Sequence, residues 1–377
     1  MIINISDREF RRILDNPKFN LPIRWSGDDF RLTVDGLFNQ YINNLEKHFL
    51  HDADDPVQYE DYIVLIKSFC GYIKRAIEYY LNGFPSKAYQ EIEQLMNNLV
   101  EYPLEIYPDK LADQFSQSSY DDKLSLFRIV EADSNIPYPR KRLFHPPFNM
   151  RSQVSTTRYS IAGYPSLYLG TSLDLCCEEI HLNPYRKFPL AALFQLENCA
   201  EYSNTEVNLI DLAIKPQDFF EEIQNDIESS LQKRRVIPLG LLNHSKVRSR
   251  YLLWYPLIAA CSFIRTNKYN AFAAEYIVPQ LLMQWLRIES DNRQNKRKDL
   301  LMGIRYFSCA SLRASDMGFT YVFPTSGEPD SYDYPYCRIL MNAFKLTKPV
   351  FMHEFSNRQQ CEEYLKNQTD INYINTD

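Results

Sequence analysis

The spacing of apolar residues changes once along this 377-residue chain, near Lys123, and this change limits the possible folds. Before it, apolar residues recur at helical spacing over long stretches, which predicts amphipathic helices. Ser6-Asp-Arg-Glu9 is a capping box that predicts a further short helix, and Asn82-Gly83 is a helix-stop signal. The three long helices are expected at 28–50, 59–81 and 86–100. Residues 1–103 are therefore predicted to form a separate α-helical domain.

After Lys123 the chain mixes short strands and helices without a regular βαβ alternation, which favours an α+β fold over a doubly wound one. Strands are expected at 124–130, 167–169, 188–196, 207–213, 303–308 and 320–323. Helices are expected at 218–233, 247–263 and the end of 271–288, loops at 134–157 and 291–299, and 338–346 is ambiguous.

Pro103, Pro108 and the polar run that follows them predict a linker at 104–122. The second domain is then expected to span 123–346, and 347–377 is left as a C-terminal extension.

Composition narrows the class of protein. A net charge of −6 and a pI of about 5.7 argue against a general nucleic-acid binder, whose binding face is basic. The chain turns polar directly after Met1-Ile-Ile, so no signal peptide is expected. The apolar run Tyr251–Ile264 is too short to span a bilayer. The eight cysteines form no C-x-x-C pair, and we expect reduced, packed thiols and a cytoplasmic location.

Common catalytic motifs are missing from the sequence. We find no G-x-G-x-x-G, no G-x-x-x-x-G-K and no G-x-S-x-G, and the six histidines have no zinc-ligand spacing. The protein is therefore expected to be a metal-free enzyme or no enzyme. Arg140-x4-His145 matches a short pattern of helical ribonucleases, but His145 precedes Pro146 and is expected in a loop, so we interpret the match as chance.

One stretch, from Arg158 to Glu179, combines groups that can converge on a ligand. Arg158 lies in a polar segment, Tyr168 in a short apolar strand, and Glu179 on a helix that Ser172 can cap. This set suits an anionic ligand whose reaction develops positive charge, as when a pyridinium nucleotide loses nicotinamide. The alternative interpretation is an ordinary loop-strand-helix unit with surface charges.

Several elements, in order, resemble the RES-domain family of bacterial toxins that consume NAD. The resemblance covers about residues 123–345. Its elements are Leu126-Phe127-Arg128, Arg158-Tyr-Ser-x-x-Gly163 with Leu167-Tyr168-Leu169, Glu179 on the next helix, and Gly303-Ile-Arg-Tyr306-Phe-Ser308. Glu275-Tyr-Ile-Val-Pro-Gln280 is similar to a segment of longer family members. Phe307 departs from the family, where Pro is common before the serine.

The resemblance implies a fold, a substrate and a partner. The expected fold is a split β core with surrounding helices, like that of ADP-ribosyltransferase toxins, preceded here by an all-α domain. The expected reaction is cleavage of the nicotinamide–ribose bond of NAD, with water or inorganic phosphate as the acceptor. The expected partner is a helix-turn-helix antitoxin or another neutralising protein. No metal, nucleic acid or membrane is expected to take part.

The resemblance also implies roles for individual residues. Arg158 and Arg128 would hold the pyrophosphate, because guanidinium groups bind phosphate oxygens in a bidentate manner. Tyr168 would pack against nicotinamide or its ribose. Glu179, rather than its neighbour Glu178, would stabilise the oxocarbenium-like charge. Ser308 would bind a phosphate or ribose oxygen.

Two weaker candidates, His145 and Tyr159, are expected near the mouth of the cleft. Two other functions stay open on the same residues: a transferase that moves ADP-ribose onto a protein, and a non-catalytic interaction module.

Overall fold

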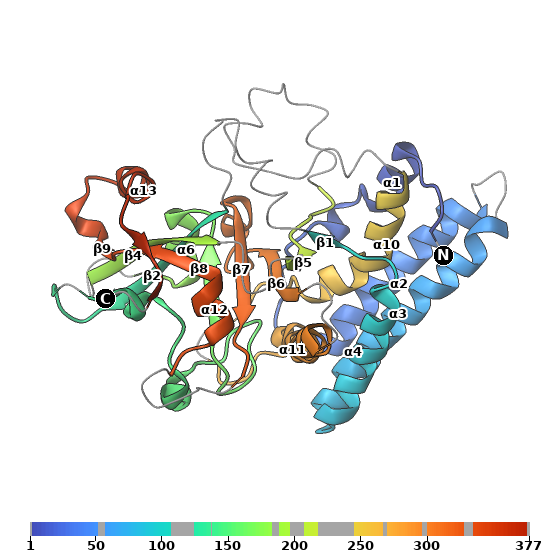
Figure 1. Cartoon of the computed structure of the whole chain (residues 1–377). Coiled ribbons are helices and arrows are strands. Elements are labelled where there is room, and N and C mark those ends of the chain that lie inside the picture. Colours follow the sequence, from blue (N-terminus) through green and yellow to red (C-terminus); the bar gives the residue numbers. More distant parts are fainter. Residues whose placement is uncertain are drawn as a thin grey trace. The chain divides into compact units, whose positions relative to one another are not determined.

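The computed structural model describes residues 2–51, 57–106, 124–136, 138–182, 188–196, 207–217, 245–266, 270–295, 300–327 and 335–374 (Figure 1). Its contacts divide the chain into two compact units. We call residues 1–105 with 214–285 the helical unit, and residues 106–213 with 286–377 the sheet unit. The predicted α+β class with a helical N-terminal region is confirmed.

The helical unit begins with a capped helix. Ser6 Oγ accepts from the main-chain N–H of Glu9, and the Glu9 carboxylate accepts from the N–H of Ser6, as the capping box predicts. The long helices fall close to the predicted ranges, and Gly83 takes a positive φ of 83° after the second of them. The helices are α1 (Asp7–Leu14), α2 (Phe30–Glu46), α3 (Val57–Leu81), α4 (Pro85–Leu99) and α10 (Ser245–Ala260), with 3-10 turns at Pro17–Phe19 and Ala274–Tyr276 and a π turn at Lys47–His51.

Helix α10 packs in the helical unit rather than with the sheet, which differs from the predicted continuous domain at 123–346. Its part from Tyr251 to Ala260 is apolar on every side and buried, so neighbours must surround that part. Tyrosine hydroxyls tie it to α2 and α3: Tyr41 donates to Leu252 O at 2.9 Å and Tyr62 to Ser249 O at 2.5 Å. Periodicity in sequence cannot show which domain a helix joins when most of it is apolar on every side.

The strands and helices of the second half follow the expected order. The predicted strands are present with bounds within a few residues, and the predicted helix at 218–233 lies outside the described residues. The expected loop at 291–299 is wrong for its first part, because α11 continues to Asn295. The elements are β1 (Glu105–Ile106), β2 (Ser125–Ala132), β3 (Ser166–Gly170), α6 (Leu173–Glu179), β4 (Phe188–Leu196), β5 (Val207–Leu212), α11 (Ile277–Asn295), β6 (Leu300–Phe307), β7 (Phe319–Pro324), α12 (Arg338–Ala343), β8 (Phe344–Thr347), β9 (Val350–Phe351), α13 (Arg358–Lys366) and β10 (Ile371–Asn372).

The sheet is mixed, with the strand order β5-β6-β7-β3-β2-β4-β8-β10. Strands β5 and β6 are parallel and the other neighbours in this order are antiparallel. Strand β2 pairs with β4 along its whole length, but it pairs with β3 only at Phe127↔Gly170. The sheet therefore opens between β2 and β3 beyond this point.

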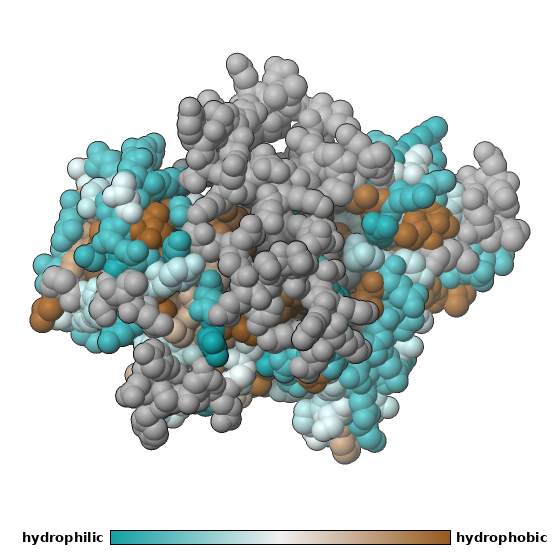
Figure 2. All heavy atoms as spheres, viewed as in Figure 1, coloured by the Kyte–Doolittle hydropathy of each residue, from teal (hydrophilic) through white to brown (hydrophobic). Residues whose placement is uncertain are grey.

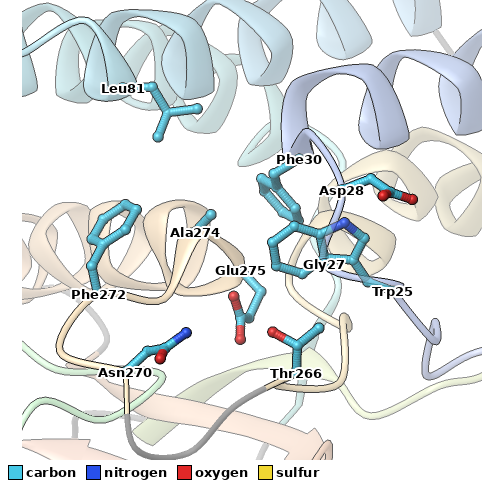
Figure 3. Close-up of a pocket in the computed structure, with 10 residues that line it drawn as sticks. All are labelled: Trp25, Gly27, Asp28, Phe30, Leu81, Thr266, Asn270, Phe272, Ala274 and Glu275. Atoms are coloured by element: carbon cyan, nitrogen blue, oxygen red, sulfur yellow. The ribbon is translucent and has the colours of Figure 1, made fainter.

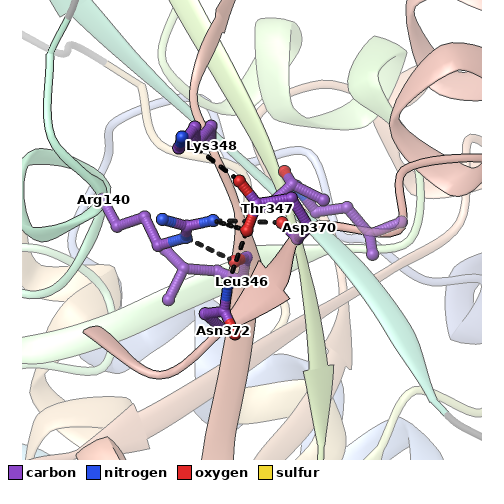
Figure 4. Close-up of polar contacts among 7 residues, drawn as sticks. Arg140, Leu346, Thr347, Lys348, Asp370 and Asn372 are labelled. Carbon is purple, nitrogen blue, oxygen red and sulfur yellow. Dashed lines mark hydrogen bonds and ion pairs between the residues drawn. The ribbon is translucent and has the colours of Figure 1, made fainter. Parts of the chain in front are cut away.

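The C-terminal residues, predicted as an extension beyond the domain, complete the sheet. Strand β10 pairs with β8, and β9 pairs with β4. Arg140, which is 1% exposed, donates to the carbonyls of Leu346 and Asp370 and forms an ion pair with the Asp370 carboxylate at 2.8 Å (Figure 4). The tail is thus part of the sheet unit, because its hydrogen bonds satisfy a buried cation and an otherwise open strand edge.

Replacing Arg140 with leucine is expected to destabilise the sheet unit. The change leaves two main-chain carbonyls without their charged donor, a loss of about 1–3 kcal/mol in the free energy of unfolding. Urea denaturation of both proteins measures it. Lys141→Leu, an exposed neighbour, is the control and is expected to change stability little. Equal midpoints for Arg140→Leu and the unmodified protein would contradict the role of this contact.

The surface in Figure 2 is largely hydrophilic over the described residues, with small separate apolar areas. Large exposed apolar side chains such as Leu32 and Val64 are scattered along the described chain rather than gathered in one segment. None of the described helices is both long and apolar enough to cross a membrane.

Candidate active site

Three side chains from neighbouring strands share one face of the sheet. Gly170 lies opposite Thr320, and Thr320 lies opposite Tyr306. Opposite residues of an antiparallel pair share a face, and residues two apart on a strand do so as well. Tyr168, Thr320 and Tyr306 therefore project from the same face of β3, β7 and β6. The sequence predicted Tyr168, whereas Thr320 and Tyr306 gain their place only from strand pairing.

Helix α6 begins directly after β3 and carries Glu179 to this face. Ser172 caps it as predicted, with Oγ accepting from the N–H of Leu175 at 3.2 Å. Gly170 permits a close approach, since a Cβ there would lie 2.7 Å from Cys176 Sγ. At the end of the helix, the Glu179 carboxylate accepts a hydrogen bond from Thr320 Oγ1 at 3.4 Å.

Glu178 and Glu179 point to different neighbours. The charge of Glu179 acts on Tyr306, a residue of the sheet face. The charge of Glu178 acts on Cys177 and Arg358, on the side of α13. Successive helical residues differ in direction by about 100°, which accounts for the separation. Glu179 is thus the acid on the side of Thr320 and Tyr306, and its predicted role at a ligand stays a prediction.

Tyr306 marks the centre of a mixed-charge cluster. Burial raises its pKa well above the usual value, the charges of Glu179 and the hydroxyls of Tyr168 and Tyr159 raise it further, and the positive charge of Arg158 lowers it. Tyr159 packs on Tyr306 with ring centroids 4.7 Å apart. The structure therefore brings four predicted residues, Arg158, Tyr159, Tyr168 and Glu179, to one place.

The segment before β3 is fixed by the hydroxyl of Tyr168. This hydroxyl donates to the carbonyl of Tyr159, and it hydrogen bonds with Thr157 Oγ1 at 2.7 Å. Arg158, between these two residues, is 7% exposed. Its position is thus determined by the strand tyrosine.

Arg128 lies where the sheet opens, and its Nη1 donates to the carbonyl of Tyr168 at 2.9 Å. Burial lowers the pKa of this guanidinium to about 10. Its Nε is buried without a hydrogen-bond partner, and it forms no ion pair with any carboxylate in the part of the chain that the structure describes. A half-buried cation that has no counter-ion and one buried, unpaired N–H favours an anion at this position.

Ser308 follows β6 and is fully buried. Its Oγ accepts a hydrogen bond from the N–H of Ala310 at 3.2 Å, which stabilises the turn after the strand. The arrangement gives this serine a structural contact, and its predicted contact with a ligand stays a prediction.

His145, a weaker sequence candidate, is a buried structural residue and not a group at a cleft mouth. Its Nε2 accepts from the N–H of Cys337 at 3.0 Å, and its Nδ1 donates to the carbonyl of Pro146 at 2.8 Å. Both ring nitrogens are used, and the ring is 0% exposed. Burial lowers the pKa of His145 to about 4.

The buried, neutral His145 predicts a pH dependence of stability. An unfolded histidine has a pKa of about 6.5, so between pH 6.5 and 4 the unfolded state binds more protons than the folded state. Stability is therefore expected to fall as pH decreases through this window, and His145→Gln is expected to weaken that dependence. Urea midpoints at pH 7 and pH 5 measure it. Parallel pH profiles for the two proteins would rule out this contribution.

The tail supports the helix that carries Glu179. Glu362 on α13 is 3% exposed, and its carboxylate accepts from the N–H of Leu173, the first residue of α6, at 2.8 Å. Arg358 also pairs with Asp174 at 2.7 Å. The sequence held no signal for this contact, because 189 positions separate Leu173 from Glu362.

Within the described residues no group of three or more histidine, cysteine, aspartate or glutamate side chains could hold a metal ion. The vicinal Cys176 and Cys177 are free and buried against the sheet, as expected for packed thiols.

Comparison with known proteins finds one toxin-named relative. The chain is 26% identical over 353 residues to "Putative toxin YopC" of Bacillus subtilis (strain 168), a match that spans 92% of this chain and 72% of that protein. No family model matches the chain. No solved structure matches it either.

Proposed function

We propose that this protein is an NAD-degrading toxin that cleaves the bond between nicotinamide and ribose by hydrolysis or phosphorolysis. The observation that carries the proposal is the cluster of Arg158, Tyr168 and Glu179 around Tyr306 on one sheet face. This cluster supplies a cation, an aromatic ring and a carboxylate at one place.

Two guanidinium groups suit the pyrophosphate of NAD. Arg128 is half-buried and has no carboxylate partner among the described residues, and a phosphate oxygen would satisfy both its charge and its buried Nε–H. Arg158 lies near the tyrosines that border the same face. Phosphate binding would thus place the nicotinamide ribose toward Tyr168.

Glu179 suits the developing positive charge. As the glycosidic bond breaks, the ribose carbon gains oxocarbenium character and the bonding electrons leave with nicotinamide, which departs as a neutral molecule. A nearby carboxylate stabilises this charge more in the transition state than in the ground state. Water or phosphate then forms the new bond to the ribose carbon. An acceptor whose attacking oxygen carries a proton releases that proton as the bond forms.

The toxin part of the proposal draws on the similarity to "Putative toxin YopC" over most of this chain. The resemblance to the RES-domain family adds a neutralising partner, such as a helix-turn-helix antitoxin. An enzyme that depletes NAD would stop the growth of the cell that makes it, so that cell needs a partner that blocks the activity.

Purified full-length protein incubated with NAD, with and without inorganic phosphate, tests the proposal through the masses of the products. Free nicotinamide with ADP-ribose indicates hydrolysis, and ADP-ribose 1″-phosphate indicates phosphorolysis. ADP-ribosylated protein would instead make the protein a transferase. Unchanged NAD under all conditions would overturn the enzymatic proposal.

A further inference from the structure

The helical unit holds a pocket of about 300 Å³ that is separate from the cluster around Tyr306 (Figure 3). Its walls come from the segment before α2, the end of α3 and the segment around Ala274–Tyr276. Its volume is that of roughly ten water molecules, at the small end of ligand pockets. The size suits a small molecule rather than a dinucleotide.

Glu275 is the unusual feature of this pocket. It is 2% exposed, yet within the described residues no hydrogen bond or ion pair joins its carboxylate to another group. Figure 3 shows the carboxylate pointing into the space between Asn270 and Thr266. An ionised carboxylate removed from water without a partner is costly, so a positively charged partner would stabilise it.

The walls around Glu275 suit the apolar part of such a partner. Trp25 and Phe30 pack edge to face with centroids 5.1 Å apart, and Phe272 stacks on Tyr80 at 6.4 Å. Among the described residues, no lysine or arginine lines the pocket. The second acid, Asp28, accepts a hydrogen bond from Ser26, and Figure 3 shows its carboxylate turned away from Glu275.

We propose that this pocket binds a small organic cation, a guanidinium or primary ammonium on an apolar body, with Glu275 as its counter-ion. Carboxylate and guanidinium form paired, charge-assisted hydrogen bonds, and aromatic faces attract cations. Thr266 has an oxygen atom beside the carboxylate that would accept one of the remaining N–H groups. The acidic lining disfavours phosphate-bearing ligands, so the site is distinct from the proposed NAD site.

Benzamidine and benzamide test this proposal, because they share one shape and differ in charge. Calorimetric titration of the full-length protein at low salt is expected to show benzamidine binding at least about 10-fold more tightly than benzamide. Glu275→Gln is expected to lose at least about 10-fold in benzamidine affinity. Glu60→Gln, the same chemical change at an exposed position on α3, is expected to leave the affinity unchanged.

Equal binding of benzamidine to Glu275→Gln and to the unmodified protein, or no binding of benzamidine at all, would overturn the proposal. If Glu275→Gln does not fold, Phe272→Ala replaces it. Phe272 is 54% exposed, so its loss spares the core. That variant is expected to weaken benzamidine binding by about 3-fold or more through the lost apolar wall, and unchanged affinity would count against the site.

Discussion

Replacement of Glu179 by alanine is expected to lower the rate of NAD cleavage by about 10²–10³-fold while NAD binding changes only a few-fold. The carboxylate accepts from Thr320 and acts on the charge balance around Tyr306, next to Tyr168 and Arg158. In the proposed reaction its contribution arises mainly in the transition state, so kcat falls and KM changes little. Nicotinamide release by the purified variant and growth of cells that express it measure the effect.

Glu178→Ala is the matched control for this experiment. Glu178 lies on the same helix turn, but its charge acts on Cys177 and Arg358 instead of the tyrosine cluster. Its removal is expected to cost little activity. Wild-type activity in the Glu179 variant would exclude the mechanism. Inactivation by the Glu178 change alone would show that Glu178, and not Glu179, has the proposed role. Arg158→Ala is expected to act differently, by weakening NAD binding.

Replacement of Asp211 by asparagine is expected to destabilise the sheet unit by about 3–5 kcal/mol. Asp211 and Arg305 are each 1% exposed and form a bidentate pair between the parallel strands β5 and β6, with distances of 3.0 and 2.6 Å. Burial alone would lower the pKa of Arg305, but the Asp211 carboxylate outweighs burial and raises it. Without that carboxylate the guanidinium stays buried and uncompensated. Urea denaturation measures the loss.

Two further variants separate this buried pair from ordinary surface charge. Asp174→Asn breaks the exposed pair with Arg358 and is expected to cost less than about 1 kcal/mol. The double change Asp211→Leu with Arg305→Met removes both charges and is expected to recover part of the lost stability. A small effect of Asp211→Asn, similar to that of Asp174→Asn, would show that the pair contributes little.

The elements of this protein could be predicted from the sequence because they depend on local physics. Apolar periodicity and capping residues gave the helices at 28–50, 59–81 and 86–100 and the capped start of α6 at Ser172. The short strand β3 and the capped helix α6 that follows it placed Tyr168 and Glu179 in one strand-helix segment. The 100° step between successive helical residues separated Glu179 from Glu178.

Contacts between distant segments could not be predicted in this way. The sequence left α10 in the second domain, although its apolar part, Tyr251–Ala260, packs in the helical unit. It left residues after 346 as an extension, although Glu362 caps α6 and Asp370 neutralises Arg140. Side-chain charge is visible in a sequence, but its partner depends on which strands and helices become neighbours.

The sequence by itself therefore determined the α+β class, most helices and strands, and the residue types gathered around Tyr168. Only the tertiary structure decided that Thr320 and Tyr306 join them, that Arg305 is neutralised by Asp211 while Arg128 has no carboxylate partner among the described residues, and that Glu275 is buried beside a pocket. The reason is that strand register and burial are set by contacts between segments far apart in the chain, which local propensity and spacing do not encode.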